Sequence, residues 1–121
     1  MPYRADMIKA VALLARKPEL THAEFVEYYE NNHAELIRRL LPQIGEYRRN
    51  YLDRGNMLGA AGAPDPDFDV ISEFVFADRE AYEAMIATHA RPEVAAAIEA
   101  DEEKFLDRSR NRMYIVEVHE S

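Results

Sequence analysis

Cysteine is absent from this chain of 121 residues, and its absence removes several kinds of chemistry. A protein without thiols forms no disulfide framework, no zinc–thiolate site and no thiol nucleophile. Such a sequence suits a reducing compartment, and we expect a cytoplasmic protein. Tryptophan is absent as well, so the aromatic surfaces must come from 7 tyrosines and 5 phenylalanines.

An excess of positive charge is also missing. The chain has 15 basic against 23 acidic side chains, which gives a formal net charge of −8. Nucleic acids and anionic membranes bind basic surfaces, so we expect neither as a partner. No apolar run approaches the length of a membrane span, and we expect no membrane insertion.

Histidine and glycine are too scattered for several common sites. The 4 histidines show no HxxxH or HxH spacing, whereas a metal site needs three or four converging ligands. The glycines lie mostly in 53–67, without the lysine and the strand-to-helix context of a phosphate-binding loop. No serine occupies a nucleophile elbow. We therefore predict neither a metal nor a cofactor.

The clearest pattern that is present runs from Thr21 to Leu41. Thr21 and Glu24 have the sequence of a capping box, and Pro42 ends the pattern because it cannot extend a helical hydrogen-bond ladder. We predict one helix over this segment. Its apolar stripe consists of Phe25, Tyr29, Leu36, Ile37 and Leu40. His33 falls on the same stripe, where a plain core helix has no use for it.

The rest of the chain predicts four strands and two further helices. Apolar or alternating residues indicate strands at 7–15, 46–52, 68–76 and 112–119. Asp78 is a good cap for a helix over 79–89, and Pro92 suits the first turn of another helix over about 93–105. Segment 53–67, rich in glycine and proline, predicts a mobile lid or the edge of a pocket.

This order of elements predicts the α+β class. Strand, helix, strand, strand, helix, strand is the ferredoxin-like βαββαβ plan with an antiparallel sheet, here as a single domain over 1–121. Helices cover only one face of such a sheet, yet both faces of 7–15 and 68–76 are largely apolar. Two copies packed sheet to sheet would bury the second face. We therefore predict a homodimer, as a dimeric α+β barrel.

His33 and Asp101 are the candidate catalytic pair. Asp101 interrupts an apolar stripe much as His33 does, and the two helices should lie side by side over one sheet face. A carboxylate beside an imidazole orients the ring and raises its basicity, as a general base requires. The alternative is a buried ion pair with a purely structural role.

Tyr29, Tyr47, Tyr51 and Phe105 are the candidate substrate contacts. Tyr47 and Tyr51 share one face of the strand predicted at 46–52, and Phe105 ends the stripe of Asp101. A tyrosine hydroxyl can donate to a developing oxyanion, and its ring gives apolar contact. For any single one of these tyrosines, packing in the core is the more common role.

Two segments of the chain resemble the EthD-domain family. ARKPELTHAEFVEYYENNHAEL resembles the opening of the family, and DEEKFLDRSRNRMYIVEVHE resembles its last helix and strand. The matching residues are Arg16, Lys17, Pro18, Phe25, Tyr28, Tyr29, His33, Leu36, Asp101, Glu102, Phe105, Asp107, Ser109 and Arg110. The resemblance implies the dimeric α+β barrel superfamily, with a hydrophobic pocket between sheet and helices that holds a few polar groups.

The resemblance also implies a range of functions. Its superfamily includes cofactor-independent aromatic monooxygenases, polyketide cyclases, muconolactone-type isomerases, and dehydratases or decarboxylases. We therefore expect a small cofactor-free oxygenase, cyclase, dehydratase or lyase, with His33 as base and a hydrophobic, aromatic or polyketide-like substrate. The alternative is a non-catalytic binding or accessory protein of a catabolic or biosynthetic cluster. Tyr29 stands where the family often has tryptophan, which leaves the shape of the pocket and the substrate open.

Overall fold

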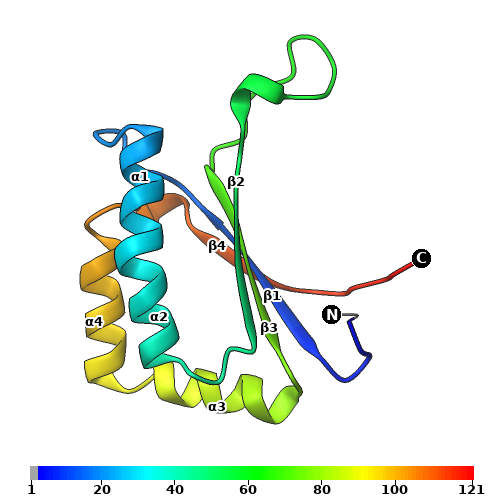
Figure 1. The fold of residues 1–121 in the computed structure, drawn as a ribbon, viewed down its shortest axis with the longest axis vertical. Coiled ribbons are helices and arrows are strands. Elements are labelled where there is room, and N and C mark those ends of the chain that lie inside the picture. The colour runs from blue at the N-terminus through cyan, green and yellow to red at the C-terminus, as the bar shows by residue number, and fades with distance from the viewer. Residues whose placement is uncertain (1–2) are drawn as a thin grey trace.

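A computed structural model describes residues 3–121 as a four-stranded antiparallel sheet with helices over one face (Figure 1). The strands are β1 (Ile8–Leu14), β2 (Glu46–Tyr51), β3 (Val70–Phe76) and β4 (Arg112–Val116). They lie in the order β2-β3-β1-β4, with β1 antiparallel to both β3 and β4. The predicted ferredoxin-like α+β fold is confirmed.

Four α-helices cover the sheet: α1 (His22–Tyr28), α2 (Ala34–Leu40), α3 (Arg79–His89) and α4 (Pro92–Glu102). The predicted capping box forms at α1, where the Thr21 side chain accepts from the Glu24 N–H and the Glu24 carboxylate accepts from the Thr21 N–H. Asp78 caps α3 as predicted. In Figure 1, α1, α2 and α4 stand beside the sheet and α3 crosses its lower end.

The helix predicted from Thr21 to Leu41 is present over 22–40, but a π-helical turn at Tyr29–His33, which the sequence did not predict, interrupts it and separates α1 from α2. In this turn the Ala34 N–H donates to the Tyr29 carbonyl, so the turn absorbs one extra residue. Five buried residues spaced four apart thereby share one face: Phe25, Tyr29, His33, Ile37 and Leu41. In an unbroken α-helix each four-residue step would overshoot a full turn by about 40° and carry them off that face.

The face of the sheet under the helices carries the core. One cluster of buried side chains packs around the π-helical turn and comprises Phe25, Tyr29, Ala34, Val70, Phe105 and Leu106. A second cluster lies toward α3 and comprises Ile37, Leu41, Phe76, Met85, Val94 and Ile98. The two clusters leave room between them and the middle of the sheet, and that space forms the pocket described below.

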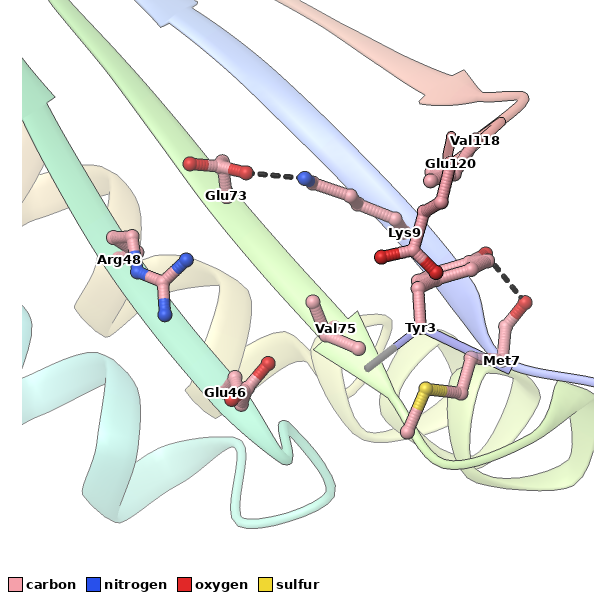
Figure 2. A pocket seen from close by; sticks show the side chains of 9 residues that line it. All are labelled: Tyr3, Met7, Lys9, Glu46, Arg48, Glu73, Val75, Val118 and Glu120. Atoms are coloured by element: carbon pink, nitrogen blue, oxygen red, sulfur yellow. Dashed lines mark hydrogen bonds and ion pairs between the residues drawn. The ribbon is translucent and has the colours of Figure 1, made fainter. Parts of the chain in front are cut away.

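In Figure 1 the helices of residues 3–121 lie on one side of the sheet, and Figure 2 looks onto the other face, with Lys9 and Glu73 in front of the strands. Apolar residues from three strands alternate onto this open face: Val11, Leu13, Ile71, Val75 and Tyr114. Lys9 forms an ion pair with Glu73 across β1 and β3. A mainly polar pocket of about 180 Å³ lies at this ion pair, with Arg48 and Glu120 on its walls. The open face is therefore apolar with charged groups set into it.

Candidate active site

An apolar pocket of about 200 Å³ lies between the sheet and the helices. Ala10, Ala12 and Phe74 from β1 and β3 contribute to the sheet side, and Met85 and Ile98 line it from α3 and α4. The pocket also contains a small set of polar groups, from Tyr29, His33, Tyr47, His89 and Glu102. A largely apolar cavity with few polar groups suits a hydrophobic small molecule.

His33 and Asp101 form the hydrogen bond that the sequence predicts. The π-helical turn places the buried His33 ring at the pocket, and α4 places the Asp101 carboxylate 2.8 Å from its Nδ1. A carboxylate only accepts, so Nδ1 carries the hydrogen, and in the neutral form of the ring the lone pair is on Nε2. Asp101 does not line the pocket. It therefore holds the ring from behind, and a catalytic role for the pair remains a prediction.

Asp101 is itself held by a second donor. The Tyr28 hydroxyl donates to the other carboxylate oxygen at 2.6 Å. Burial, together with the adjacent Asp101 carboxylate, raises the pKa of Tyr28 to about 12, so its hydroxyl stays protonated at neutral pH. Phe105 is fully buried and lies 4.9 Å from the His33 ring, centroid to centroid. It supports the imidazole and, against the sequence prediction, does not line the pocket.

Three hydroxyl groups form a chain at the other polar side of the pocket. The Tyr29 hydroxyl lies 2.6 Å from that of Tyr47 and 2.7 Å from the Ser72 Oγ. Burial raises the pKa of Tyr29 to about 12, against the opposing effect of its hydrogen bond to Ser72. Burial also raises the pKa of Tyr47. Both predicted contacts therefore line the pocket as neutral phenols.

Tyr51 is directed elsewhere. Its hydroxyl donates to Glu30 at 2.5 Å, and it is not among the residues that line the pocket. Glu30 also accepts two hydrogen bonds from Arg49, at 2.7 and 2.9 Å, and these hold the pKa of Glu30 below its usual value. The Arg49 guanidinium in turn lies 4.6 Å from the centre of the Tyr47 ring. Tyr51 was predicted to contact the substrate, but it does not line the pocket, and its hydroxyl is bound to Glu30 instead.

Several residues at the pocket were missed by sequence reasoning. Ser72 is fully buried on the helix-covered side of β3, and its signal was a hydroxyl among the apolar residues of that face. His89 on α3 and Glu102 on α4 also line the pocket, and the sequence did not predict either as a site residue. Met113 lines it too, although its side chain is more than half exposed at 57%.

The loop after β2 does not form a lid over this pocket. None of the residues 53–67 lines it, and Figure 1 shows the loop projecting beyond the sheet at the end opposite α3. Ion pairs fix its base: Arg54 reaches Asp69 at 3.0 Å, and Arg112 reaches both carboxylate oxygens of Asp67. The loop is therefore not a lid over this pocket. Its first residues, Asp53 and Arg54, instead form the edge of a separate pocket with Arg16 and His22, which agrees with the other predicted role of this segment.

Within residues 3–121, no three His, Asp or Glu side chains gather so that they could hold a metal ion. None of the helices in this described part of the chain is long and apolar enough to cross a membrane.

Comparison with known proteins links this geometry to a family. Residues 17–109 match the EthD domain. The chain is 30% identical over 108 residues to a conidial pigment biosynthesis dehydratase, EthD, of Metarhizium robertsii, a match that covers 83% of this chain and 74% of that protein.

Solved structures share the fold. An ethyl tert-butyl ether d (EthD) family protein from Bacillus halodurans superposes with a TM-score of 0.62 and 25% identity, covering 93% of this chain and 99% of that one. A dimeric protein with a ferredoxin-like fold from Bacteroides fragilis superposes with a TM-score of 0.57 and 13% identity, covering 96% and 100% of the two chains.

Proposed function

Because this chain belongs to the EthD domain family, we propose that it is an enzyme in which His33 removes a proton from a hydrophobic small molecule held in the pocket. One observation carries the proposal. The buried imidazole has its Nδ1 engaged by Asp101, and the ring lies among apolar side chains. A histidine held in this tautomer presents an unprotonated Nε2, which is the arrangement a general base needs.

Dehydration is the reaction that this site supports best. The relative that is 30% identical is named as a dehydratase, and elimination of water beside a carbonyl begins with loss of an α-proton. The imidazolium formed in that step can return the same proton to the departing hydroxyl, so one histidine serves both steps. No redox group is needed for such a reaction. Cofactor-independent oxygenation, cyclisation and carbon–carbon lysis also begin with proton removal and are distinguished by their products.

The experiment is proton exchange in deuterated water. We expect the protein to exchange the α-protons of hydrophobic β-hydroxy ketones, followed by NMR, and to release the conjugated enone, followed by ultraviolet absorbance. His33→Gln should lower both rates by roughly 10²- to 10⁴-fold, the usual contribution of a general base. His22→Gln, which changes an exposed histidine on α1, is the matched control and should leave them unchanged.

Other outcomes of this experiment identify the alternatives. Oxygen consumption without enone formation would indicate an oxygenase. Binding of the ketones without exchange or turnover would contradict the proposal and leave a non-catalytic binding or accessory protein.

We also propose that the chain works as a homodimer paired through the open faces of two sheets. Supporting this, the open face carries apolar residues that the helices leave uncovered. The ferredoxin-like protein from Bacteroides fragilis is described as dimeric.

A further inference from the structure

The chain of hydroxyls from Ser72 through Tyr29 to Tyr47 has one closed end and one open end. Ser72 on β3 is completely buried and Tyr29 is 1% exposed, whereas Tyr47 on β2 is only partly buried and lines the pocket. The distances between the three oxygens, 2.7 and 2.6 Å, are those of good hydrogen bonds between hydroxyl groups.

The direction of the hydrogens in this chain follows from its buried end. Among residues 3–121 the Tyr29 hydroxyl is the one hydrogen-bond partner recorded for the Ser72 side chain. If each hydroxyl donated toward Ser72, the last hydrogen would be buried without an acceptor, which is unfavourable. If Ser72 donates to Tyr29 and Tyr29 donates to Tyr47, the last hydrogen belongs to Tyr47 and is free at the pocket.

Tyr47 is also held firmly enough to serve as a donor. Its ring stacks on Phe74 at 4.7 Å between centroids, with 19° between the ring planes. The Arg49 guanidinium lies 4.6 Å from the centroid of the Tyr47 ring and is fixed by its two hydrogen bonds to Glu30. A tyrosine restrained in this way can point its hydroxyl at a ligand with little reorganisation.

We propose that the Tyr47 hydroxyl donates a hydrogen bond to a carbonyl or phenol oxygen of the substrate, and that Ser72 and Tyr29 are positioning residues that direct this hydrogen into the pocket. The inference rests on the proposed function and narrows its substrate class. The oxygen must be conjugated with the carbon that loses its proton, because only then does charge develop on the oxygen.

The resulting steps balance. The C–H bond breaks, its proton goes to His33 Nε2, and its electron pair moves to the carbonyl oxygen as an enolate that accepts from Tyr47. The enolate then re-forms the carbonyl and expels the β-hydroxyl, which takes the proton from His33 and leaves as water. No oxidant or further reactant takes part, and His33 and Tyr47 end in their starting protonation states.

A chromophoric phenol tests the donor without requiring turnover. 4-Nitrophenol and its halogenated relatives absorb visible light as phenolates, so a pH titration in the presence of saturating protein gives the ionisation constant of the bound phenol. We expect the wild-type protein to favour the bound phenolate. Tyr47→Phe should lower the ionisation constant of the bound phenol roughly tenfold, which corresponds to the loss of one hydrogen bond to a charged group. Ser72→Ala should lower this ionisation constant by a smaller factor, because without Ser72 the Tyr47 hydrogen is no longer directed into the pocket.

Tyr82→Phe is the matched control, since Tyr82 packs on Phe76 from α3 and does not line the pocket. An unchanged ionisation constant in both Tyr47→Phe and Ser72→Ala would overturn the proposal, and so would failure of the whole phenol series to bind the wild-type protein. His33→Gln separates this proposal from the proposed function, since it should abolish α-proton exchange while the phenol titration still responds to Tyr47→Phe.

Discussion

Asp101 is the residue whose contribution can be separated from that of His33. Asp101→Asn keeps the size of the side chain but replaces a charged acceptor by a neutral one, and hydrogen bonds to charged groups are stronger by about 1 kcal/mol. We expect turnover to fall by roughly tenfold with little change in KM. Steady-state kinetics with the ketone substrates measure both quantities.

The matched control for Asp101 is Glu99→Gln, which removes a carboxylate from the exposed surface of the same helix. It should leave turnover unchanged. If Asp101→Asn lowers the melting temperature but not turnover, the His33–Asp101 pair is structural.

The tyrosines make the stability of the protein sensitive to high pH. Burial raises the pKa of Tyr28 and of Tyr29 from 10 to about 12. Between these values the unfolded chain has lost protons that the folded chain retains. The contribution of these tyrosines to the free energy of unfolding is therefore constant below pH 10 and falls as the pH rises toward 12. Denaturant unfolding from pH 8 to pH 11.5 measures this fall, and Tyr29→Phe should make it less steep. If the free energy of unfolding of Tyr29→Phe fell as steeply with pH as that of the wild type, the raised pKa of Tyr29 would be contradicted.

Sequence reasoning could find residues that break a local pattern, and it found His33 and Asp101 on that ground. It could not decide whether a side chain lines a cavity, because that depends on which neighbouring residue forms a hydrogen bond with its polar group. Tyr51 and Tyr47 lie on the same face of β2, yet Glu30 engages the hydroxyl of Tyr51 while that of Tyr47 remains at the pocket. Likewise Phe105 packs against the His33 ring and does not line the pocket.

At the scale of elements, periodicity located the strands and helices to within a few residues. The exception is the π-helical turn, whose signal was present in the strict four-residue spacing from Phe25 to Leu41. An α-helix with 3.6 residues per turn cannot keep such a spacing on one face without absorbing a residue. The turn sets Tyr29 and His33 side by side, with 5.6 Å between ring centroids, and thereby brings the two polar parts of the pocket together.

Deleting Asn31 should convert this turn into regular α-helix. Asn31 is exposed within the turn, and after its deletion Ala34 stands four residues after Tyr29, as an α-helical hydrogen bond requires. We expect a lower melting temperature, because the deletion rotates the buried residues after the turn by about 100° around the axis relative to those before it, so that they no longer share one face. For the same reason turnover and phenol binding should fall at least tenfold in the fraction that stays folded.

The control for this deletion is Asn31→Ala, which keeps the chain length and the turn. Thermal unfolding followed by circular dichroism, with phenol titration on the same samples, makes the comparison. Full ligand binding by the deletion variant would show that the π-helical turn has no part in the site.

At the scale of the whole molecule, the two faces of the sheet have separate tasks. The helix-covered face carries the pocket. The open face carries Val11, Leu13 and Val75 together with the Lys9–Glu73 ion pair. Apolar strands without a covering layer favour association, and a self-complementary pairing of two copies is the commonest way to cover such a face.

We therefore predict that Val11→Glu separates the dimer. Val11 lies on β1 opposite Glu73 on β3, so the new carboxylate would face an existing one and would be costly to bury in an interface. Light scattering should give a dimer for the wild type and for Ala23→Glu, which adds the same charge on an exposed position of α1, and a monomer for Val11→Glu. The monomer should melt at a lower temperature, yet bind phenols as the wild type does, because the pocket lies on the helix-covered face and Val11 lies on the other face. A wild-type protein that is monomeric and folded at micromolar concentration would contradict the pairing. Loss of phenol binding in Val11→Glu, while the variant stays folded, would show that the partner chain completes the site.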